Sequence, residues 1–251
     1  MPLAVSQGTR EAELDRLRPY DFHGVELSVR GSHATGDCPF CGGDGNFSVE
    51  VSTGLWRCFS CGTGTTAGGG NGLVFTRLIW EMAASRAVSG PGKGFHAAVA
   101  QDRRLLSPDT LAAWGVRQAN DGTWLIPGYS AEGRLDQVYR RTHMLDKGEW
   151  VGRLLPTPGI WPDGKVHALH LPSGDFDLAR HNLIVTEGPW DGMALWEVDK
   201  GRDANIISVP GCNVWRDEWT AMCRGKQVVL MFDSDHPRDN AGRTTRAGWD
   251  G

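Results

Sequence analysis

The hydrophobic positions in the last third of the chain alternate between short apolar runs and helix-like spacing. NLIVTEG, IISVPG and QVVLMFDSD are apolar runs of strand length, whereas PWDGMALWEV and WRDEWTAMCRG have a pattern typical of helices. Strands and helices that alternate at this spacing predict an open parallel sheet with crossover helices over residues 182–251. The first strand is predicted to end at Glu187, the first helix to begin at Pro189 and the third strand to end at Asp233.

The middle of the chain has a mixed pattern, which predicts an α+β region over residues 106–181. Ser107 followed by Pro108 is a typical helix start, because serine caps a helix and proline is tolerated in its first turn. The segment WLIPGYSAEGRLDQVYRR alternates as two strands do, with a turn predicted at 131–133. Residues 86–105 contain SGPGKG and are predicted to be a linker.

Residues 1–85 are predicted to form a small N-terminal domain around two Cys-x-x-Cys pairs. A short helical stretch, EAELDRLR, precedes the cysteines, and a helix is predicted over GLVFTRLIWEMAAS after them. Between the two pairs, FSVEV and LWRCF alternate around a turn at 52–54. This hairpin would bring the two pairs side by side.

The four cysteines predict a structural zinc site. Cys38, Cys41, Cys58 and Cys61 follow the pattern C-x2-C-x16-C-x2-C, which is the spacing of a zinc ribbon with its core at 35–72. A redox motif would need only one of the pairs. Because a site with four cysteine ligands has no open position for substrate, the zinc is not expected to be the catalyst.

Composition narrows the class of protein further. With 251 residues the chain has room for about two domains, and its formal net charge of −4 limits any nucleic-acid contact to local patches. No apolar run is long enough for a signal peptide or a membrane span, so a cytoplasmic protein without a membrane partner is predicted. Paired cysteines in that compartment more often bind metal than form disulfides. Cys212 and Cys223 stand alone and are predicted to be small, partly buried side chains.

Three side chains of the cysteine hairpin have two possible roles. Trp56, Arg57 and Phe59 could stack on bases or contact phosphate. The alternative is that Trp56 and Phe59 only pack the interior of a very small domain.

Carboxylates follow two strands of the predicted parallel sheet. Glu187 ends one strand, and Asp233 and Asp235 end another. Ligands bind beyond the carboxyl ends of parallel strands, so these groups are expected to face one crevice. Crowded carboxylates favour a hard cation, and Mg²⁺ with few protein ligands is typical of nucleotidyl transfer. Asp191 could join them, or it could only complement the dipole of the following helix.

The motifs LIVTEGPWDGMAL and VVLMFDSDHPRDNAGR resemble the TOPRIM domain, with Glu187 as its glutamate and Asp233 and Asp235 as its Asp-x-Asp. Together with the preceding ribbon, CPFC…WRCFSCG, the chain looks like the DnaG-like primases, and most like those at the N-terminus of phage primase–helicases. The resemblance implies an α/β fold. Its parts are a β-rich ribbon, the N-terminal part of an RNA polymerase domain at 106–181, and a TOPRIM subdomain at 182–251.

The resemblance also implies an activity. It implies a DNA primase, a DNA-directed RNA polymerase that makes short RNA primers on a single-stranded DNA template from ribonucleoside triphosphates. Zinc would stiffen the ribbon that reads the template, and Mg²⁺ held by Asp233 and Asp235 would act in catalysis. Glu187 would be a metal ligand or a general base, and Asp191 would complete the ring. The implied setting is the cytoplasm of a bacterial host or phage-infected cell. A replicative helicase is expected as partner, and separate encoding is expected because the sequence contains no Gly-x-x-x-x-Gly-Lys-Ser/Thr motif.

Basic residues of VYRRTHMLDKGEW lie where such primases place residues that face nucleotide and template. These are Arg140, Arg141 and Lys147, and the alternative is that they are a solvated surface.

Two other functions share parts of this pattern. A topoisomerase would need a nucleophilic tyrosine, and none of Tyr20, Tyr129 and Tyr139 has a suitable context. A catalytically silent zinc-ribbon/TOPRIM accessory protein that binds DNA in a replication complex is the alternative to the primase. It is favoured by the few residues after Asp235, because a TOPRIM subdomain incomplete at its C-terminus is expected.

Overall fold

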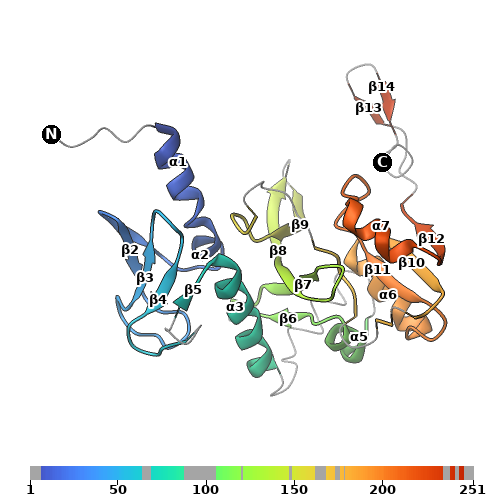
Figure 1. Cartoon of the computed structure of the whole chain (residues 1–251), viewed down its shortest axis with the longest axis horizontal. Coiled ribbons are helices and arrows are strands. Elements are labelled where there is room, and N and C mark those ends of the chain that lie inside the picture. The colour runs from blue at the N-terminus through green and yellow to red at the C-terminus, as the bar shows by residue number, and fades with distance from the viewer. Residues whose placement is uncertain are drawn as a thin grey trace. The chain divides into compact units, whose positions relative to one another are not determined.

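The computed structural model describes most of the chain, which forms two compact units (Figure 1). The described residues are 7–63, 69–87, 106–119, 121–146, 149–161, 168–172, 176–177, 179–233, 238–240 and 243–245. The first unit comprises Met1–Ser89, Gln118–Leu125 and Gln137–Lys165, and the second comprises Gly90–Arg117, Ile126–Asp136 and Val166–Gly251. Within the described residues, each helix is too short or too polar to span a bilayer.

The first unit contains a five-stranded antiparallel sheet in the order β1-β2-β3-β4-β5. Its strands are β1 (Ser28–Arg30), β2 (His33–Gly36), β3 (Phe47–Glu50), β4 (Trp56–Cys58) and β5 (Gly69–Gly70). Helices α1 (Gln7–Asp15) and α2 (Arg18–Phe22) precede it, and α3 (Gly72–Ala87) follows it. The predicted hairpin is confirmed as β3 and β4, whereas the hairpin of β1 and β2 was not predicted.

The core of this sheet is an aromatic cluster that includes side chains from α2 and α3. The Phe47 and Trp56 rings are stacked with their centroids 5.2 Å apart, and the centroids of the Tyr20 and Phe75 rings lie 4.7 Å apart. All four side chains are at most 2% exposed. Each aromatic pair contributes roughly 0.5–1.5 kcal/mol beyond area burial. The ribbon therefore does not rely on its own few residues for a core.

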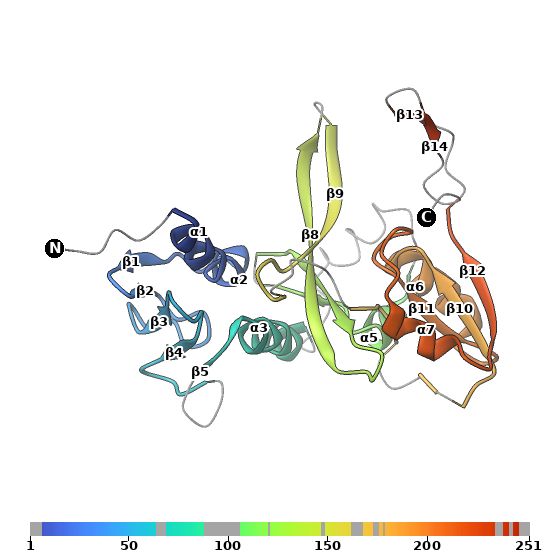
Figure 2. The same cartoon turned by 45° about the horizontal axis from the view of Figure 1, so that its top comes forward.

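A second sheet has the strand order β6-β7-β8-β9. Its strands are β6 (Arg117–Gln118), β7 (Trp124–Tyr129), β8 (Leu135–Asp146) and β9 (Glu149–Pro156). β8 and β9 form the long antiparallel hairpin that is visible in Figure 2. The predicted strands β7 and β8 and the turn between them are confirmed, and the Ser130 hydroxyl accepts a backbone hydrogen bond from Glu132 across that turn.

The second unit contains the predicted parallel sheet. Strands β10 (Asn182–Thr186), β11 (Asn205–Ser208) and β12 (Gln227–Met231) pair in parallel in the order β11-β10-β12. Helices α6 (Pro189–Asp199) and α7 (Asp217–Cys223) connect them. The helix start at Ser107 is also confirmed, because its hydroxyl accepts a hydrogen bond from the Thr110 amide at the start of α5 (Pro108–Ala113). A short antiparallel pair, β13 (Arg238–Asn240) and β14 (Arg243–Thr245), was not predicted.

The strands of the parallel sheet differ in burial. Leu183, Val185 and Ile207 are fully buried together with Trp219 of α7. In contrast, Leu230 of β12 is 62% exposed. The third strand was predicted from its apolar run, and within the described residues it pairs with β10 alone.

The predicted domain boundaries at 85, 105 and 181 stay a prediction. Residues 86 and 87 end α3, and the rest of the predicted linker lies outside the described residues.

Candidate functional site

The four predicted zinc ligands lie together in the first unit. Their sulfur atoms are all within 4.8 Å of one another. Cys38 Sγ lies 3.9 Å from Cys61 Sγ, and Cys41 Sγ lies 3.8 Å from Cys58 Sγ. A zinc–sulfur bond of about 2.3 Å gives a tetrahedron with edges of about 3.8 Å. The cluster therefore fits a zinc ion, both in its donor atoms and in its size.

Local backbone geometry explains how the cysteines converge. Gly42 and Gly62 have positive φ angles of 71° and 58°, which a residue with a Cβ rarely adopts. The Gly42 amide donates to the Cys38 carbonyl at 2.8 Å and closes the first knuckle. In the second knuckle the Ser60 amide donates to Cys58 Sγ at 3.4 Å. Burial raises the pKa of the Cys38 thiol to about 12, and a bound cation would favour its thiolate form.

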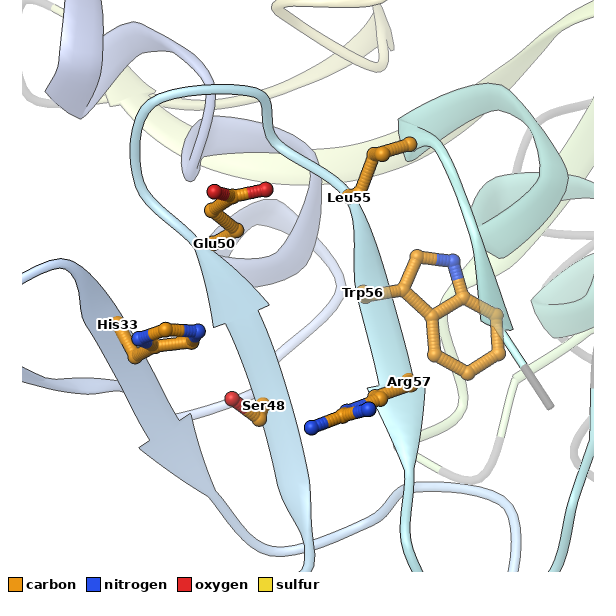
Figure 3. Close-up of a pocket in the computed structure, with 6 residues that line it drawn as sticks. All are labelled: His33, Ser48, Glu50, Leu55, Trp56 and Arg57. Carbon is orange, nitrogen blue, oxygen red and sulfur yellow. The ribbon is translucent and has the colours of Figure 1, made fainter. Parts of the chain in front are cut away.

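The outer face of the ribbon sheet carries a shallow pocket of about 310 Å³. Figure 3 shows the Arg57 side chain extended over the sheet toward Ser48 and His33, whereas the Trp56 ring extends away from them. The Arg57 guanidinium lies 4.1 Å from the centroid of the Phe59 ring, which is 60% exposed. Arg57 and Phe59 are therefore open to a ligand.

Trp56 lies in the interior of the first unit. Its ring is 2% exposed, stacks on Phe47 and donates from Nε1 to the Asn71 carbonyl. A ring enclosed in this way packs the interior of the unit, and contact between Trp56 and the template stays a prediction.

The acidic residues lie at the carboxyl edge of the parallel sheet. Glu187 follows β10 and Asp233 follows β12, the adjacent parallel strand. The Glu187 carboxylate accepts a hydrogen bond of 3.1 Å from the backbone amide of Asp233. Glu187 is half-buried and Asp233 is exposed. The two strand ends are thus linked directly, with both carboxylates at the same edge.

Two further acids complete the predicted set. Asp191 lies in the first turn of α6, where its Oδ2 lies close to Gly188, the neighbour of Glu187. Its position suits both a ligand role and a role at the helix start. Asp235 lies outside the described residues, and among those described the only cluster of metal-binding side chains is that of the cysteines.

Cys212, which stands alone in the sequence, is a neighbour of Glu187 in the structure. Burial raises the pKa of the Cys212 thiol, and the charge of Glu187 and a hydrogen bond to it raise that pKa further. The loop after β11 brings this thiol to the same edge of the sheet. Its position beyond a strand end, in VPGC, was the signal that could have placed it there.

Arg140 is held by partners from within the first unit. Its guanidinium donates to the Phe22 carbonyl, to Asp121 Oδ2 at 2.5 Å and to Thr123 Oγ1 at 3.1 Å. The side chain is 13% exposed, so it contributes to packing whether or not it also faces a nucleotide. The adjacent Arg141 is half-buried on β8, and Lys147 lies outside the described residues.

No protein-family model matches the chain, and neither does any curated protein. Its structure is similar to that of the zinc-binding and RNA polymerase domains of Aquifex aeolicus primase, at 17% identity over 92% of this chain and 73% of that one (TM-score 0.37). It is also similar to the primase fragment of the bacteriophage T7 primase–helicase, at 19% identity over 84% and 81% of the two chains (TM-score 0.39). A third similar structure is the catalytic core of E. coli primase, at 15% identity over 64% and 63% (TM-score 0.43).

At sequence identities this low, an activity can be assigned to the chain only from its own residues. The described architecture is a four-cysteine antiparallel ribbon, a mixed α/β middle region and a parallel three-stranded sheet. The similarity to the solved structures concerns this architecture alone.

Proposed function

We propose that this chain is a DNA primase, which synthesises short RNA primers on single-stranded DNA from ribonucleoside triphosphates. The observation that carries the proposal is the link between Glu187 and Asp233 at the carboxyl ends of adjacent parallel strands. This edge of an open parallel sheet is where substrates bind. A separate four-thiolate ribbon in the same chain supports a role on nucleic acid.

The four thiolates hold a structural zinc ion in this proposal. The size of the cluster and its donor set fit zinc, and all four positions are taken by protein sulfur. The ion joins the β3–β4 hairpin to the preceding knuckle, which fixes the outer face of the sheet. Arg57 and Phe59 on that face then contact phosphate and base of the template.

The carboxylates of the parallel sheet hold magnesium. Glu187 and Asp233 offer the oxygen ligands that Mg²⁺ prefers, and Asp235 and Asp191 extend the set. Bound magnesium would neutralise charge on the triphosphate during nucleotidyl transfer. Glu187 either takes part as a ligand or accepts the proton of the attacking 3′ hydroxyl. Its hydrogen bond to the Asp233 amide orients its carboxylate for either task.

The experiment that tests the proposal is primer synthesis by the full chain on a library of single-stranded templates with Mg²⁺ and ribonucleotides. Template-dependent RNA is expected from the wild type, and Asp233→Asn should reduce it by at least about a hundredfold, as expected for loss of a charge that acts on the transition state. Asp203→Asn is the matched control, because Asp203 is an exposed aspartate just before β11, at the opposite edge of the sheet.

Two outcomes contradict the proposal. If Asp233→Asn makes primers at the wild-type rate, the acidic edge has no catalytic role. If no template supports synthesis while single-stranded DNA still binds, the chain is a catalytically silent accessory module of a replication complex. A replicative helicase is the expected partner in either case, and co-purification of the two proteins tests it.

A further inference from the structure

The first unit contains a cavity of about 640 Å³ that none of the functions above uses. It lies between the helices α1 and α2, the β3–β4 turn, the start of α3 and residues 159–161. It shares no lining residue with the ribbon pocket of Figure 3. Its volume falls within the range of about 300–1,000 Å³ typical of small-molecule sites.

One side of the cavity is cationic. Arg16 and Arg18 line it together with Asp15. Arg18 Nε lies 3.2 Å from Asp15 Oδ1, whereas Arg16 forms no ion pair with a described residue. The described charged groups that line the cavity therefore sum to one positive charge, and Arg16 is the group available to an anion.

The start of α3 adds to this polarity. Asn71, which also lines the cavity, caps the helix by accepting a hydrogen bond of 3.0 Å from the Val74 amide. The first turn of a sixteen-residue helix carries partial positive charge, which favours an anion next to Arg16.

Two further residues that line the cavity are apolar. Trp161 and Ile160 line it, and both are partly exposed, so their surfaces are accessible to a ligand. An indole ring beside an aliphatic side chain is a suitable surface for a planar heterocycle.

Two glycines allow the segments that line the cavity to approach one another closely. A Cβ at Gly159, where φ is +71°, would lie 2.7 Å from the Asp15 carbonyl oxygen, and a Cβ at Gly72 would lie 2.9 Å from Pro19 Cγ. Segments that approach this closely have no room to collapse further. The cavity is therefore formed before any ligand binds.

From this arrangement we propose that the cavity binds a free nucleotide, with its phosphates on Arg16 and its base against Trp161. Cationic and aromatic side chains around one preformed volume match the two chemically distinct halves of a nucleotide. Inorganic phosphate alone would use only half of these contacts. A long single strand is not favoured, because the volume suits a ligand of small-molecule size.

The test is equilibrium dialysis of the full chain with radiolabelled ATP, in magnesium-free buffer and in an Asp233→Asn background. This background suppresses binding at the acidic edge of the other unit. Saturable binding of one ATP per chain is expected, with Arg16→Ala weakening it at least about tenfold. Arg77→Ala removes an exposed arginine from α3 outside the cavity and should leave the affinity within about twofold.

A second variant separates the two halves of the ligand. Trp161→Ala should weaken ATP at least about tenfold while changing the affinity for inorganic tripolyphosphate by less than about threefold. Zinc content and thermal unfolding establish that each variant is folded. Arg16→Glu, a change at an exposed position, serves as the second test if Trp161→Ala fails to fold.

The proposal is overturned by any of three results: no saturable ATP binding, unchanged affinity in both Arg16→Ala and Trp161→Ala, or binding of a single-stranded oligonucleotide with none of ATP. ATP binding is measured without magnesium on the Asp233→Asn variant. The result of this binding experiment therefore does not depend on whether the chain synthesises primers.

Discussion

The carboxylate of Glu187 accepts the backbone amide hydrogen of Asp233 across the adjacent ends of two parallel strands, at 3.1 Å. Forty-six residues separate the two positions in the chain. The contact fixes where the side chain of one acid lies relative to the backbone of the other. It therefore allows the charge of Glu187 and its hydrogen-bonding role to be tested separately.

Glu187→Gln should abolish primer synthesis while leaving stability nearly unchanged. The amide oxygen of glutamine can still accept the hydrogen bond from Asp233, so the free energy of unfolding should change by less than about 1 kcal/mol. The loss of charge should reduce synthesis at least about a hundredfold. Primer synthesis and urea unfolding are measured on the same preparation. Synthesis at the wild-type rate by a folded Glu187→Gln protein would exclude the proposed role.

Gly192→Ala should destabilise the second unit. A Cβ at this position of α6 would clash with the Ser208 hydroxyl and lie 2.5 Å from Trp114 Cη2. Because both neighbours are buried, a loss of about 1–3 kcal/mol is expected in chemical unfolding. Gly211→Ala is the control. Its Cβ would meet only Val214 Cγ2 at an ordinary 3.7 Å, and a change within about 0.5 kcal/mol is expected there. Equal effects of the two variants would contradict the packing seen at Gly192.

Cys58→Ser should remove bound zinc and unfold the ribbon. Four-thiolate zinc sites contribute on the order of 10 kcal/mol of binding free energy, which is lost when one ligand is replaced. Zinc content by mass spectrometry and amide exchange of β3 and β4 measure the two effects. Cys223→Ser changes a cysteine of the second unit, where Sγ contacts the Trp219 carbonyl, and should keep one zinc per chain. Wild-type zinc content in Cys58→Ser would contradict the assignment.

His23 should make the stability of the first unit depend on pH. Burial lowers the pKa of His23 to about 3, and the nearby Arg140 charge lowers it as well. Between about pH 6.5 and pH 3 the unfolded chain therefore binds a proton that the folded protein does not. Stability from this group is complete above that window and falls on acidification, by roughly 1 kcal/mol per pH unit.

The His23 effect is isolated by a substitution, because His170 is also buried and its burial lowers its pKa to about 4, with the same sign. His23→Gln should reduce the slope of stability against pH, since glutamine can keep a hydrogen bond to Thr157 without titrating. His33→Gln, at an exposed position, should leave the slope unchanged. Unfolding curves at several pH values check this, and an unchanged slope in His23→Gln would show that the residue does not contribute.

Arg140→Ala should lower stability whatever its effect on nucleotide use. The change removes donors to Phe22, Asp121 and Thr123, and a cost of about 1–3 kcal/mol is expected. Arg134→Ala is the control, because Arg134 is exposed. Its free energy of unfolding should change by no more than about 0.5 kcal/mol. A contact with nucleotide would raise the KM of folded Arg140→Ala for ribonucleotides. A purely structural role would lower the folded fraction and leave KM unchanged.

Several elements of the fold could be predicted from the local sequence pattern. The two Cys-x-x-Cys pairs, the hairpin between them and the strand–helix alternation after residue 182 all follow from spacing, because turn geometry and side-chain periodicity are local properties. The edge shared by Glu187 and Asp233 follows as well, since parallel topology places the carboxyl ends of neighbouring strands together.

The sequence alone thus determined the cysteine cluster, the parallel sheet and the edge at which its acids lie. Only the tertiary structure decided that Trp56 is enclosed by Phe47 and Phe75, and that Arg140 is held by the Phe22 carbonyl, 118 residues away. It also decided that β12 keeps an exposed apolar surface within the described residues. These outcomes depend on which distant segments pack together, and the identity of a single residue does not reveal whether its side chain meets solvent or another segment.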